Sequence, residues 1–146
     1  MIRVHGTAIA LGEEGVLLRG PSGSGKSDLA LRLIEGGARL VADDQTELHD
    51  TGAGVRLSSP VSIAGQMEIR GLGIVRVPQL ASAPLRLVVD LVPPDAIERL
   101  PEPLFCRFFG CEVPRLLLAP FEASAPAKLR AALRAVSPVI AHAGNQ

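Results

Sequence analysis

One segment of the sequence has the residue types and spacing of a phosphate-binding loop. Gly20 to Ser27 fits the pattern G-x-x-x-x-G-K-[ST] at every fixed position. Glycines in such a loop let successive backbone N–H groups converge on phosphate oxygens, and the start of the next helix adds partial positive charge. Lys26 can reach the β- and γ-phosphates, and the Ser27 hydroxyl can ligate Mg²⁺. The predicted nucleoside-triphosphate-binding residues are Gly20, Pro21, Ser22, Gly23, Ser24, Gly25, Lys26 and Ser27.

The use of lysine in this sequence supports the same interpretation. The chain has only two lysines, Lys26 and Lys128, against 13 arginines. Arginine therefore provides most of the ordinary positive surface charge. A lysine at the position that the loop motif requires indicates a specific role for Lys26.

A nucleotide-hydrolysing or phosphoryl-transferring site also needs carboxylates, and two arrangements compete. In the first, Asp90 follows the apolar run Leu87-Val88-Val89 and holds the metal ion, as in an ordinary P-loop ATPase. In the second, Asp43 and Asp44 end a short apolar strand after the loop's helix. Carboxylates at the C-terminal end of a strand lie where open α/β sheets bind ligands, and a cation would relieve the repulsion between adjacent acids. The residue pattern favours Asp43-Asp44 and leaves Asp90 open.

The elements that would position these residues are mostly strands, with two helices. A hydrophobic strand leads into the loop, a helix follows it and ends at Gly36-Gly37, and a second helix lies near the C-terminus. Residues 100–112 show no clear period, and residues from 141 are expected to fray. This is the pattern of one α/β domain spanning residues 1–146. The expected strands are 3–10, 16–19, 38–42, 47–49, 55–58, 66–70, 74–77, 84–92 and 113–118, and the expected helices are 26–37 and 124–136.

The composition excludes several classes of protein. The 146 residues are 47% hydrophobic with a net charge of zero, so neither disorder nor a general attraction to nucleic acid or acidic lipid is expected. No apolar stretch is long enough to cross a membrane, and the first residues do not resemble a secretion signal. Cys106 and Cys111 have no histidine near them, which fits two thiols in a reducing compartment. We expect a cytoplasmic protein that binds neither nucleic acid nor membranes.

Three blocks of the sequence resemble the HPr kinase/phosphorylase family, in particular its C-terminal catalytic domain. They are GPSGSGKSD at residues 20–28, RLVADD at 39–44 and EIRGLGIV at 68–75. Their order and spacing also match, and the resemblance extends from about Val4 to about Phe121. It implies a P-loop kinase fold with a central mixed β-sheet and flanking helices. Because these family members carry a further N-terminal domain, we expect a short form that corresponds to the catalytic domain only.

The resemblance implies an ATP- and Mg²⁺-dependent kinase that phosphorylates a serine of HPr, a small phosphocarrier of the sugar phosphotransferase system. The same site can reverse the reaction by phosphorolysis, and the family also allows assembly into a homo-oligomer. By resemblance, Asp44 is the general base, and Glu68 is a Mg²⁺ ligand beside Ser27. His5 matches a catalytic-site histidine and Arg99 an active-site arginine. The catalytic residues implied are thus His5, Lys26, Asp44 and Arg99.

Two other functions remain alternatives at this point. One is a P-loop ATPase or small-molecule kinase that uses Asp90 as its metal ligand. The other is a nucleotide-sensing module that binds a triphosphate without catalysis and signals through a protein contact.

Overall fold

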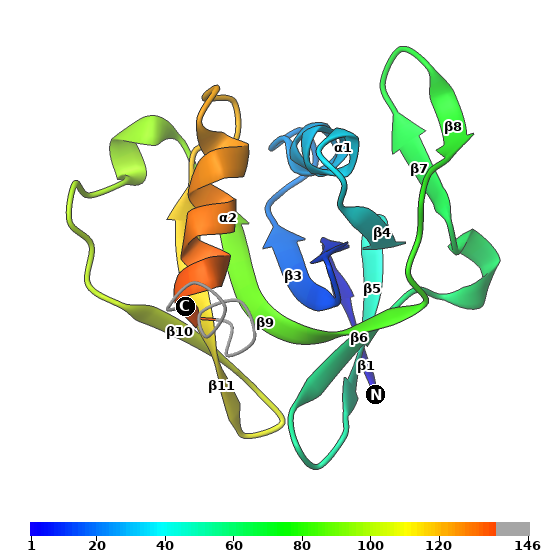
Figure 1. The fold of residues 1–146 in the computed structure, drawn as a ribbon, viewed down its shortest axis with the longest axis horizontal. Helices are drawn as coiled ribbons and strands as arrows, with labels where there is room; N and C mark the ends of the chain where they lie inside the picture. Colours follow the sequence, from blue (N-terminus) through cyan, green and yellow to red (C-terminus); the bar gives the residue numbers. More distant parts are fainter. Residues whose placement is uncertain (137–146) are drawn as a thin grey trace.

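The computed structural model describes residues 1–136 and shows a curved β-sheet with two α-helices packed on one side (Figure 1). Nine strands form the sheet, and two more form a separate hairpin, β7–β8. In chain order the elements are β1 (Ile2–His5), β2 (Thr7–Leu11), β3 (Glu14–Arg19), α1 (Lys26–Glu35), β4 (Arg39–Ala42), β5 (Gln45–Asp50), β6 (Val55–Ser58), a 3₁₀ turn (Val61–Ile63), β7 (Gln66–Ile69), β8 (Gly73–Arg76), β9 (Ser82–Leu91), a 3₁₀ turn (Pro94–Ala96), β10 (Leu104–Phe108), β11 (Cys111–Leu118) and α2 (Ala125–Val136).

The long strand β9 joins the two parts of the sheet. Its first residues pair with β6, and its second half lies between β3 and β11. The β3–β9 and β9–β11 pairs are parallel, whereas the other pairs are antiparallel, so the sheet is mixed. The predicted α/β class with a mixed sheet and flanking helices is confirmed. The predicted fraying of residues 141–146 lies outside the described residues.

The alternation of side chains along β3 creates two cores. Val16 and Leu18 face the helices and pack with Leu29 of α1 and Leu129 of α2. Leu17 points to the opposite face, where residues of β5, β6 and β9 enclose it. Each fully buried leucine contributes about 2 kcal/mol through removal of apolar surface from water. Neither α1 nor α2, the two α-helices in residues 1–136, is long and apolar enough to cross a membrane.

Two segments differ from the sequence prediction. The strand predicted over residues 3–10 is broken at Gly6, so that β1 pairs with β5 while β2 pairs with β3 and β4. A Cβ atom at Gly6 would lie 2.9 Å from the carbonyl oxygen of Leu18, so only glycine fits this close approach. Residues 104–108, expected to lack regular structure, form β10, because β11 offers them an antiparallel partner.

Asp90 ties three neighbouring strands together at the end of β9. Its carboxylate accepts two hydrogen bonds from Arg19 of β3, at 2.7 and 2.9 Å, and one from Arg115 of β11 at 2.5 Å. Although burial raises the pKa of Asp90, the hydrogen bonds and charges of the two arginines outweigh it and lower that pKa below its ordinary value. Both carboxylate oxygens are thus engaged by cations. This arrangement favours an internal ion pair for Asp90 over the alternative of a metal ligand.

We predict that Asp90→Asn lowers the free energy of unfolding by about 2–3 kcal/mol at neutral pH, because it leaves two partly buried guanidinium groups without their counter-charge. Since the folded-state pKa is lowered, the carboxylate stabilises the fold above its ordinary pKa of 3.8. That stabilisation disappears as the pH falls through the folded-state value. Urea unfolding at several pH values measures both effects.

The matched control is Asp95→Asn, at an exposed position after β9, which should change the unfolding free energy by less than about 0.5 kcal/mol. A wild-type advantage over Asp90→Asn that stays constant into strong acid would contradict the ion-pair account.

Candidate active site

A cavity of about 780 Å³ opens where the phosphate-binding loop, the first turns of α1 and the β7–β8 hairpin meet. This volume suits a small-molecule ligand. The cavity carries side chains of both charges, which suits a phosphate group together with a cation. The lining residues are Ser22, Gly23, Gly25, Lys26, Ser27, Asp28, Leu31, Asp44, Glu68, Ile69, Arg70, Gly71, Gly73 and Phe121.

The loop between β3 and α1 has the backbone of a phosphate cradle. Gly25 has φ of 103°, a left-handed conformation that other residues adopt only with strain, and α1 begins at the next residue. The Lys26 ammonium is buried and donates to the carbonyl oxygens of Gly20 at 2.5 Å and Pro21 at 3.1 Å. The hydroxyl of Ser24 is buried and has no partner among residues 1–136. Phosphate oxygens would satisfy such donors, so the loop fits the group that the sequence predicted.

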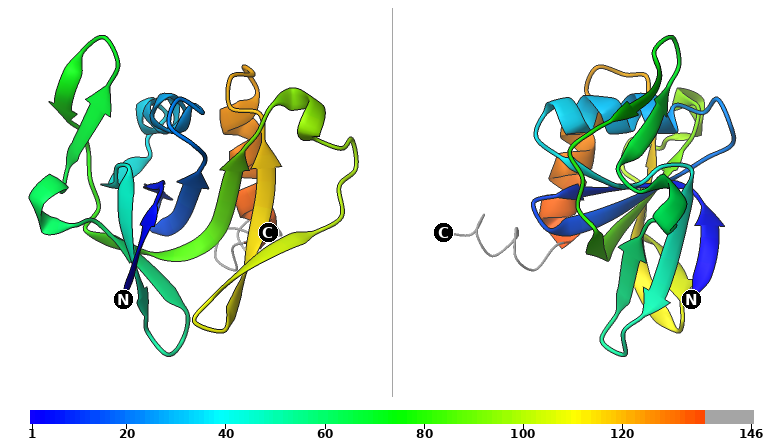
Figure 2. Two further views of the ribbon diagram at one scale, coloured as in Figure 1. Left: turned by 180° about the vertical axis from the view of Figure 1, so that it is seen from behind. Right: turned by 90° about the vertical axis from the view of Figure 1, so that its right-hand side faces the viewer.

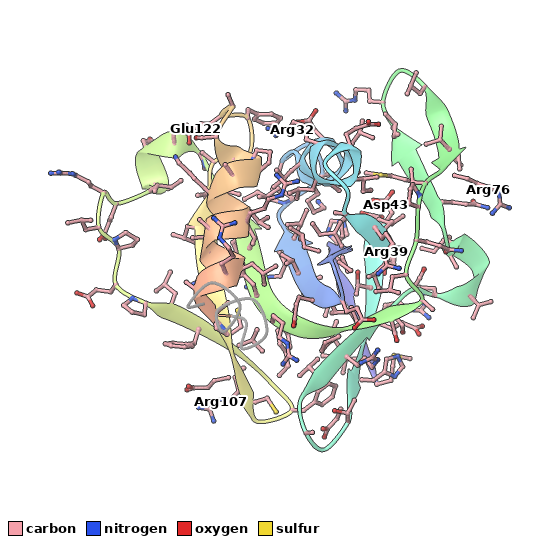
Figure 3. All side chains as sticks on the ribbon, viewed as in Figure 1. Arg32, Arg39, Asp43, Arg76, Arg107 and Glu122 are labelled. Atoms are coloured by element: carbon pink, nitrogen blue, oxygen red, sulfur yellow. The ribbon has the colours of Figure 1, made fainter. Side chains whose placement is uncertain are left out.

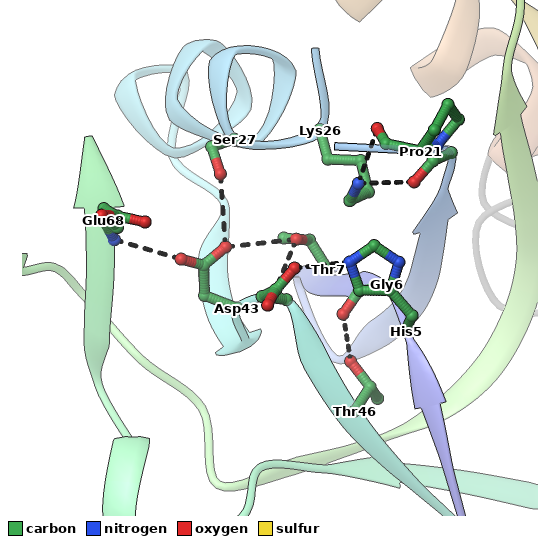
Figure 4. A network of polar contacts seen from close by, with 11 residues as sticks. His5, Gly6, Thr7, Pro21, Lys26, Ser27, Asp43, Thr46 and Glu68 are labelled. Atoms are coloured by element: carbon green, nitrogen blue, oxygen red, sulfur yellow. Dashed lines mark hydrogen bonds and ion pairs between the residues drawn. The ribbon is translucent and has the colours of Figure 1, made fainter. Parts of the chain in front are cut away.

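Asp43 lies at the centre of a network of polar contacts beside the phosphate loop (Figure 4). It directly follows β4, is only 8% exposed, and accepts hydrogen bonds from three sides. The Ser27 hydroxyl donates to its Oδ1 at 3.4 Å, the Thr7 hydroxyl donates to the same oxygen at 3.2 Å, and the backbone N–H of Glu68 donates to Oδ2 at 3.1 Å. One carboxylate therefore links the P-loop helix, the start of β2 and the β7–β8 hairpin.

The protonation of Asp43 reflects this burial. Removal from water raises the pKa of the Asp43 carboxyl, and the neighbouring Asp44 adds to that rise, while the bonds from Glu68, Thr7 and Ser27 oppose it. A cation bound in the cavity would favour the charged form. Asp43 is thus placed to respond to a metal ion beside Ser27.

Asp44 lies on the open side of the same turn. Its φ is 65°, its side chain is 62% exposed, and its Oδ1 lies 2.7 Å from Nε2 of His5. The left-handed backbone at Asp44 interrupts the regular strand between β4 and β5. The two carboxylates face different surroundings, since Asp43 is buried and Asp44 is exposed. The Asp44 carboxylate is therefore accessible to an incoming molecule, while its contact with His5 orients it.

The backbone around Gly6 and Thr7 fixes this turn. The N–H of Gly6 donates to the carbonyl of Asp44 at 2.8 Å, and the N–H of Asp44 donates to the Thr7 hydroxyl at 3.1 Å. Thr46 donates from its hydroxyl to the carbonyl of Gly6 at 2.9 Å. Thr7 is fully buried and serves as donor to one acid and acceptor from the other.

The structure brings most of the predicted site residues together. The residues that surround one region are His5, Lys26, Ser27, Asp44 and Glu68, together with Ser22, Gly23 and Gly25 of the loop. Arg99 does not join them: it is exposed and lines a separate groove of about 380 Å³ near Leu116 and Lys128.

Sequence reasoning missed three residues that the fold places at the site. These are Thr7, Arg70 and Phe121. A polar residue inside the apolar run that becomes β2 is a signal that could have identified Thr7. Arg70 lies inside a block already singled out for Glu68. Phe121 carries no local signal, since only the tertiary fold brings it to the loop.

The residues present fit a Mg²⁺ ion that phosphate oxygens help to hold. No group of three His, Cys, Asp or Glu side chains within residues 1–136 forms a metal site by itself. Mg²⁺ commonly takes only one or two protein oxygens and completes its shell with water and phosphate. Ser27 and Glu68 supply such oxygens at the cavity wall.

We predict that Thr7→Val lowers the free energy of unfolding by about 1–3 kcal/mol, because the backbone N–H of Asp44 loses its acceptor and the buried carboxylate of Asp43 loses a donor. Thr7→Ser keeps the hydroxyl and should recover most of that loss. Thr51→Val, in the exposed turn between β5 and β6, is the matched control and should have little effect. A Thr7→Val variant as stable as wild type, or a Thr7→Ser variant that loses as much as Thr7→Val although it keeps the hydroxyl, would contradict this account.

Comparison with known proteins gives concordant results. The family model described as HPr Serine kinase C-terminal domain matches residues 1–101. HPr kinase/phosphorylase of Clostridium tetani is 45% identical over 78 residues, which are 53% of this chain and 26% of that protein. HPr kinase/phosphorylase of Exiguobacterium sibiricum is 43% identical over 81 residues, or 55% and 26% of the two chains. The chain thus spans about a quarter of the length of these curated relatives.

A solved structure extends the likeness beyond the aligned sequence. The Hpr(Ser) kinase/phosphatase from Coxiella burnetii superimposes with a TM-score of 0.81 at 26% identity, covering 92% of this chain and 90% of that one. Residues 1–101, which the family model matches, include the phosphate loop, Asp43-Asp44 and the β7–β8 hairpin. The chain therefore belongs to the HPr serine kinase C-terminal domain family.

Proposed function

We propose that this protein transfers the γ-phosphoryl group of Mg²⁺-bound ATP to a serine of an HPr-type phosphocarrier in the cytoplasm. Membership of the family and the names of the relatives support this reaction. The observation that carries the proposal is the placement of an exposed carboxylate, Asp44, on the wall of the phosphate-loop cavity. An acceptor hydroxyl can approach that carboxylate from outside while the donor occupies the loop.

The donor side of the site neutralises phosphate charge. The backbone N–H groups of the loop and the start of α1 favour the phosphate oxygens, and Lys26 adds a full positive charge. A bound Mg²⁺ would supply further charge neutralisation. Ser27 and Glu68 hold it in this proposal, and Asp43 orients Ser27 through the 3.4 Å hydrogen bond. Arg70 adds a second cationic side chain to the cavity wall.

The acceptor side activates a serine. A serine hydroxyl is too weakly acidic to ionise at neutral pH, so a carboxylate within hydrogen-bonding reach aligns it and takes its proton as the new O–P bond forms. Asp44 has this role, and the 2.7 Å contact with His5 keeps its carboxylate oriented. In the reverse direction, an oxygen of inorganic phosphate attacks the phosphorus of phosphoserine, so that a P–O–P bond forms and the serine O–P bond breaks. Pyrophosphate leaves, and protonated Asp44 returns the proton to the serine oxygen.

The β7–β8 hairpin supports a protein as the acceptor. It projects from the sheet, as the views in Figure 2 show, and its residues Glu68, Ile69 and Gly73 line the cavity. Leu72 and Ile74 expose large apolar side chains on this hairpin. Both residues are next in sequence to Gly71 and Gly73, which line the cavity. A protein substrate would cover this apolar surface on binding, whereas a small molecule would leave it in water.

The proposal is tested by incubating the protein with ATP, Mg²⁺ and HPr of the same organism and locating phosphate by mass spectrometry. Phosphoserine that is absent with the Lys26→Ala variant supports it. ATP binding without phosphate on HPr would favour the nucleotide-sensing module instead.

We predict that Asp44→Asn lowers the rate of serine phosphorylation by at least about 10²-fold, the usual contribution of a general base. Asparagine tolerates positive φ, so the turn and Mg-ATP affinity should be retained. Asp50→Asn at the exposed end of β5 is the matched control and should phosphorylate HPr normally. Quenched-flow rates and calorimetric ATP binding give the two readouts, and transfer at the wild-type rate would remove Asp44 from the chemistry.

We also predict that Glu68→Gln raises the Mg²⁺ concentration needed for half-maximal phosphorylation by about tenfold, because loss of a ligand charge weakens metal binding. Glu35→Gln, at the exposed end of α1, should leave that requirement unchanged. A Mg²⁺ titration of the initial rate measures both. The same titration curve for Glu68→Gln and wild type would exclude Glu68 from the metal shell.

A further inference from the structure

Phe121 lies at the edge of the cavity although it is far from the phosphate loop in sequence. It belongs to the segment between β11 and α2, outside the residues that the family model matches. Its ring contacts the loop: a Cβ atom placed on Gly25 would be 2.9 Å from Cζ of Phe121. The side chain is nevertheless 70% exposed and lines the cavity. The ring of Phe121 therefore packs against the loop through one part of its surface and leaves the rest accessible to a ligand.

Arg32 of α1 holds this segment in position. Its guanidinium donates to the carbonyl oxygens of Pro120 and, at 3.3 Å, of Glu122, the two residues that flank Phe121. Asp28, one turn earlier on α1, pairs with the same guanidinium at 3.0 Å. Figure 3 shows Arg32 and Glu122 at the facing sides of α1 and the segment before α2. The helix that begins at the phosphate loop therefore also fixes the aromatic residue beside that loop.

The two ends of the cavity have different chemistry. Ser27, with Asp43 and Glu68, lies toward the β7–β8 hairpin, and this end suits the metal ion and the terminal phosphate. The segment that carries Phe121 lies on the opposite side of α1 from the hairpin, as both views from front and behind show (Figures 1 and 2). A triphosphate that runs through the loop with its γ-end at Ser27 thus directs its nucleoside toward Phe121.

We propose that Phe121 stacks on the nucleobase of the bound nucleotide and is the main base contact of this site. The inference rests on the proposed use of a nucleoside triphosphate as phosphoryl donor. A phenylalanine ring stacks on the π-face that every base has and has no hydrogen-bonding group to read the base edge. ATP and GTP should therefore bind with similar affinity, and the base should contribute affinity more than selectivity.

Calorimetric titration without a phosphocarrier tests this contact. Mg-ATP, Mg-GTP and Mg-tripolyphosphate, which has no base, are compared on wild type and variants. Phe121→Ala should weaken both nucleotides by about tenfold, the scale of one aromatic–base stack, and leave tripolyphosphate unchanged. Phe121→Tyr keeps a ring and should bind as wild type. Phe105→Ala removes another exposed phenylalanine, on β10 outside the cavity, and should change nothing.

Two results would overturn the inference. Unchanged ATP affinity in Phe121→Ala would show that the ring does not touch the base. An equal loss for ATP and tripolyphosphate would show that Phe121 only supports the loop through Gly25, and Phe121→Leu, which keeps bulk against Gly25, would then bind normally. Because binding alone is measured, absence of HPr phosphorylation would leave this test intact and would count only against the proposed function.

Discussion

The hydrogen bonds of the Thr7 hydroxyl hold the site together. One buried oxygen donates to the carboxylate of Asp43 and accepts from the backbone N–H of Asp44. It thereby joins the break between β1 and β2 to the turn between β4 and β5. The two segments run antiparallel to each other and bend at the same corner of the sheet. The N–H of Gly6 completes this corner by donating to the Asp44 carbonyl. Without this corner, neither acid would keep its position relative to the phosphate loop.

The same corner gives two adjacent aspartates different environments. Asp43 stays in the interior with three donors, and its raised pKa reflects the burial of its charge. Asp44, with φ of 65°, leaves the strand direction and reaches solvent beside His5. In the proposed reaction, the acid on the metal side must be fixed and shielded, whereas the acid that takes a proton from a protein serine must be reachable. One turn meets both requirements because its backbone changes conformation between the two residues.

Patterns local in sequence predicted much of this structure. The phosphate loop, α1 with its glycine end, and the β5–β6 hairpin follow from spacing and turn residues that act within a few positions. The break at Gly6 depends on the carbonyl of Leu18, and β10 depends on pairing with β11. The neighbours of Thr7 and Phe121 come from distant segments, and Arg99 follows an irregular connection whose path no periodicity specifies. Contacts of that kind are properties of the fold, so a sequence pattern could not locate them.

Asp90 shows that an acid at the end of an apolar strand can be used inside the fold. An apolar strand that ends in aspartate suits a metal ligand and an internal ion pair equally well. Here Arg19, directly before the phosphate loop, and Arg115 on β11 occupy both oxygens of Asp90. This ion pair stiffens the strand ends on which the loop is mounted, but it leaves that side without a free carboxylate for a cation. Ser27 faces the opposite side, toward Asp43 and the β7–β8 hairpin, and in the proposed reaction the Mg²⁺ ion binds at that end of the cavity.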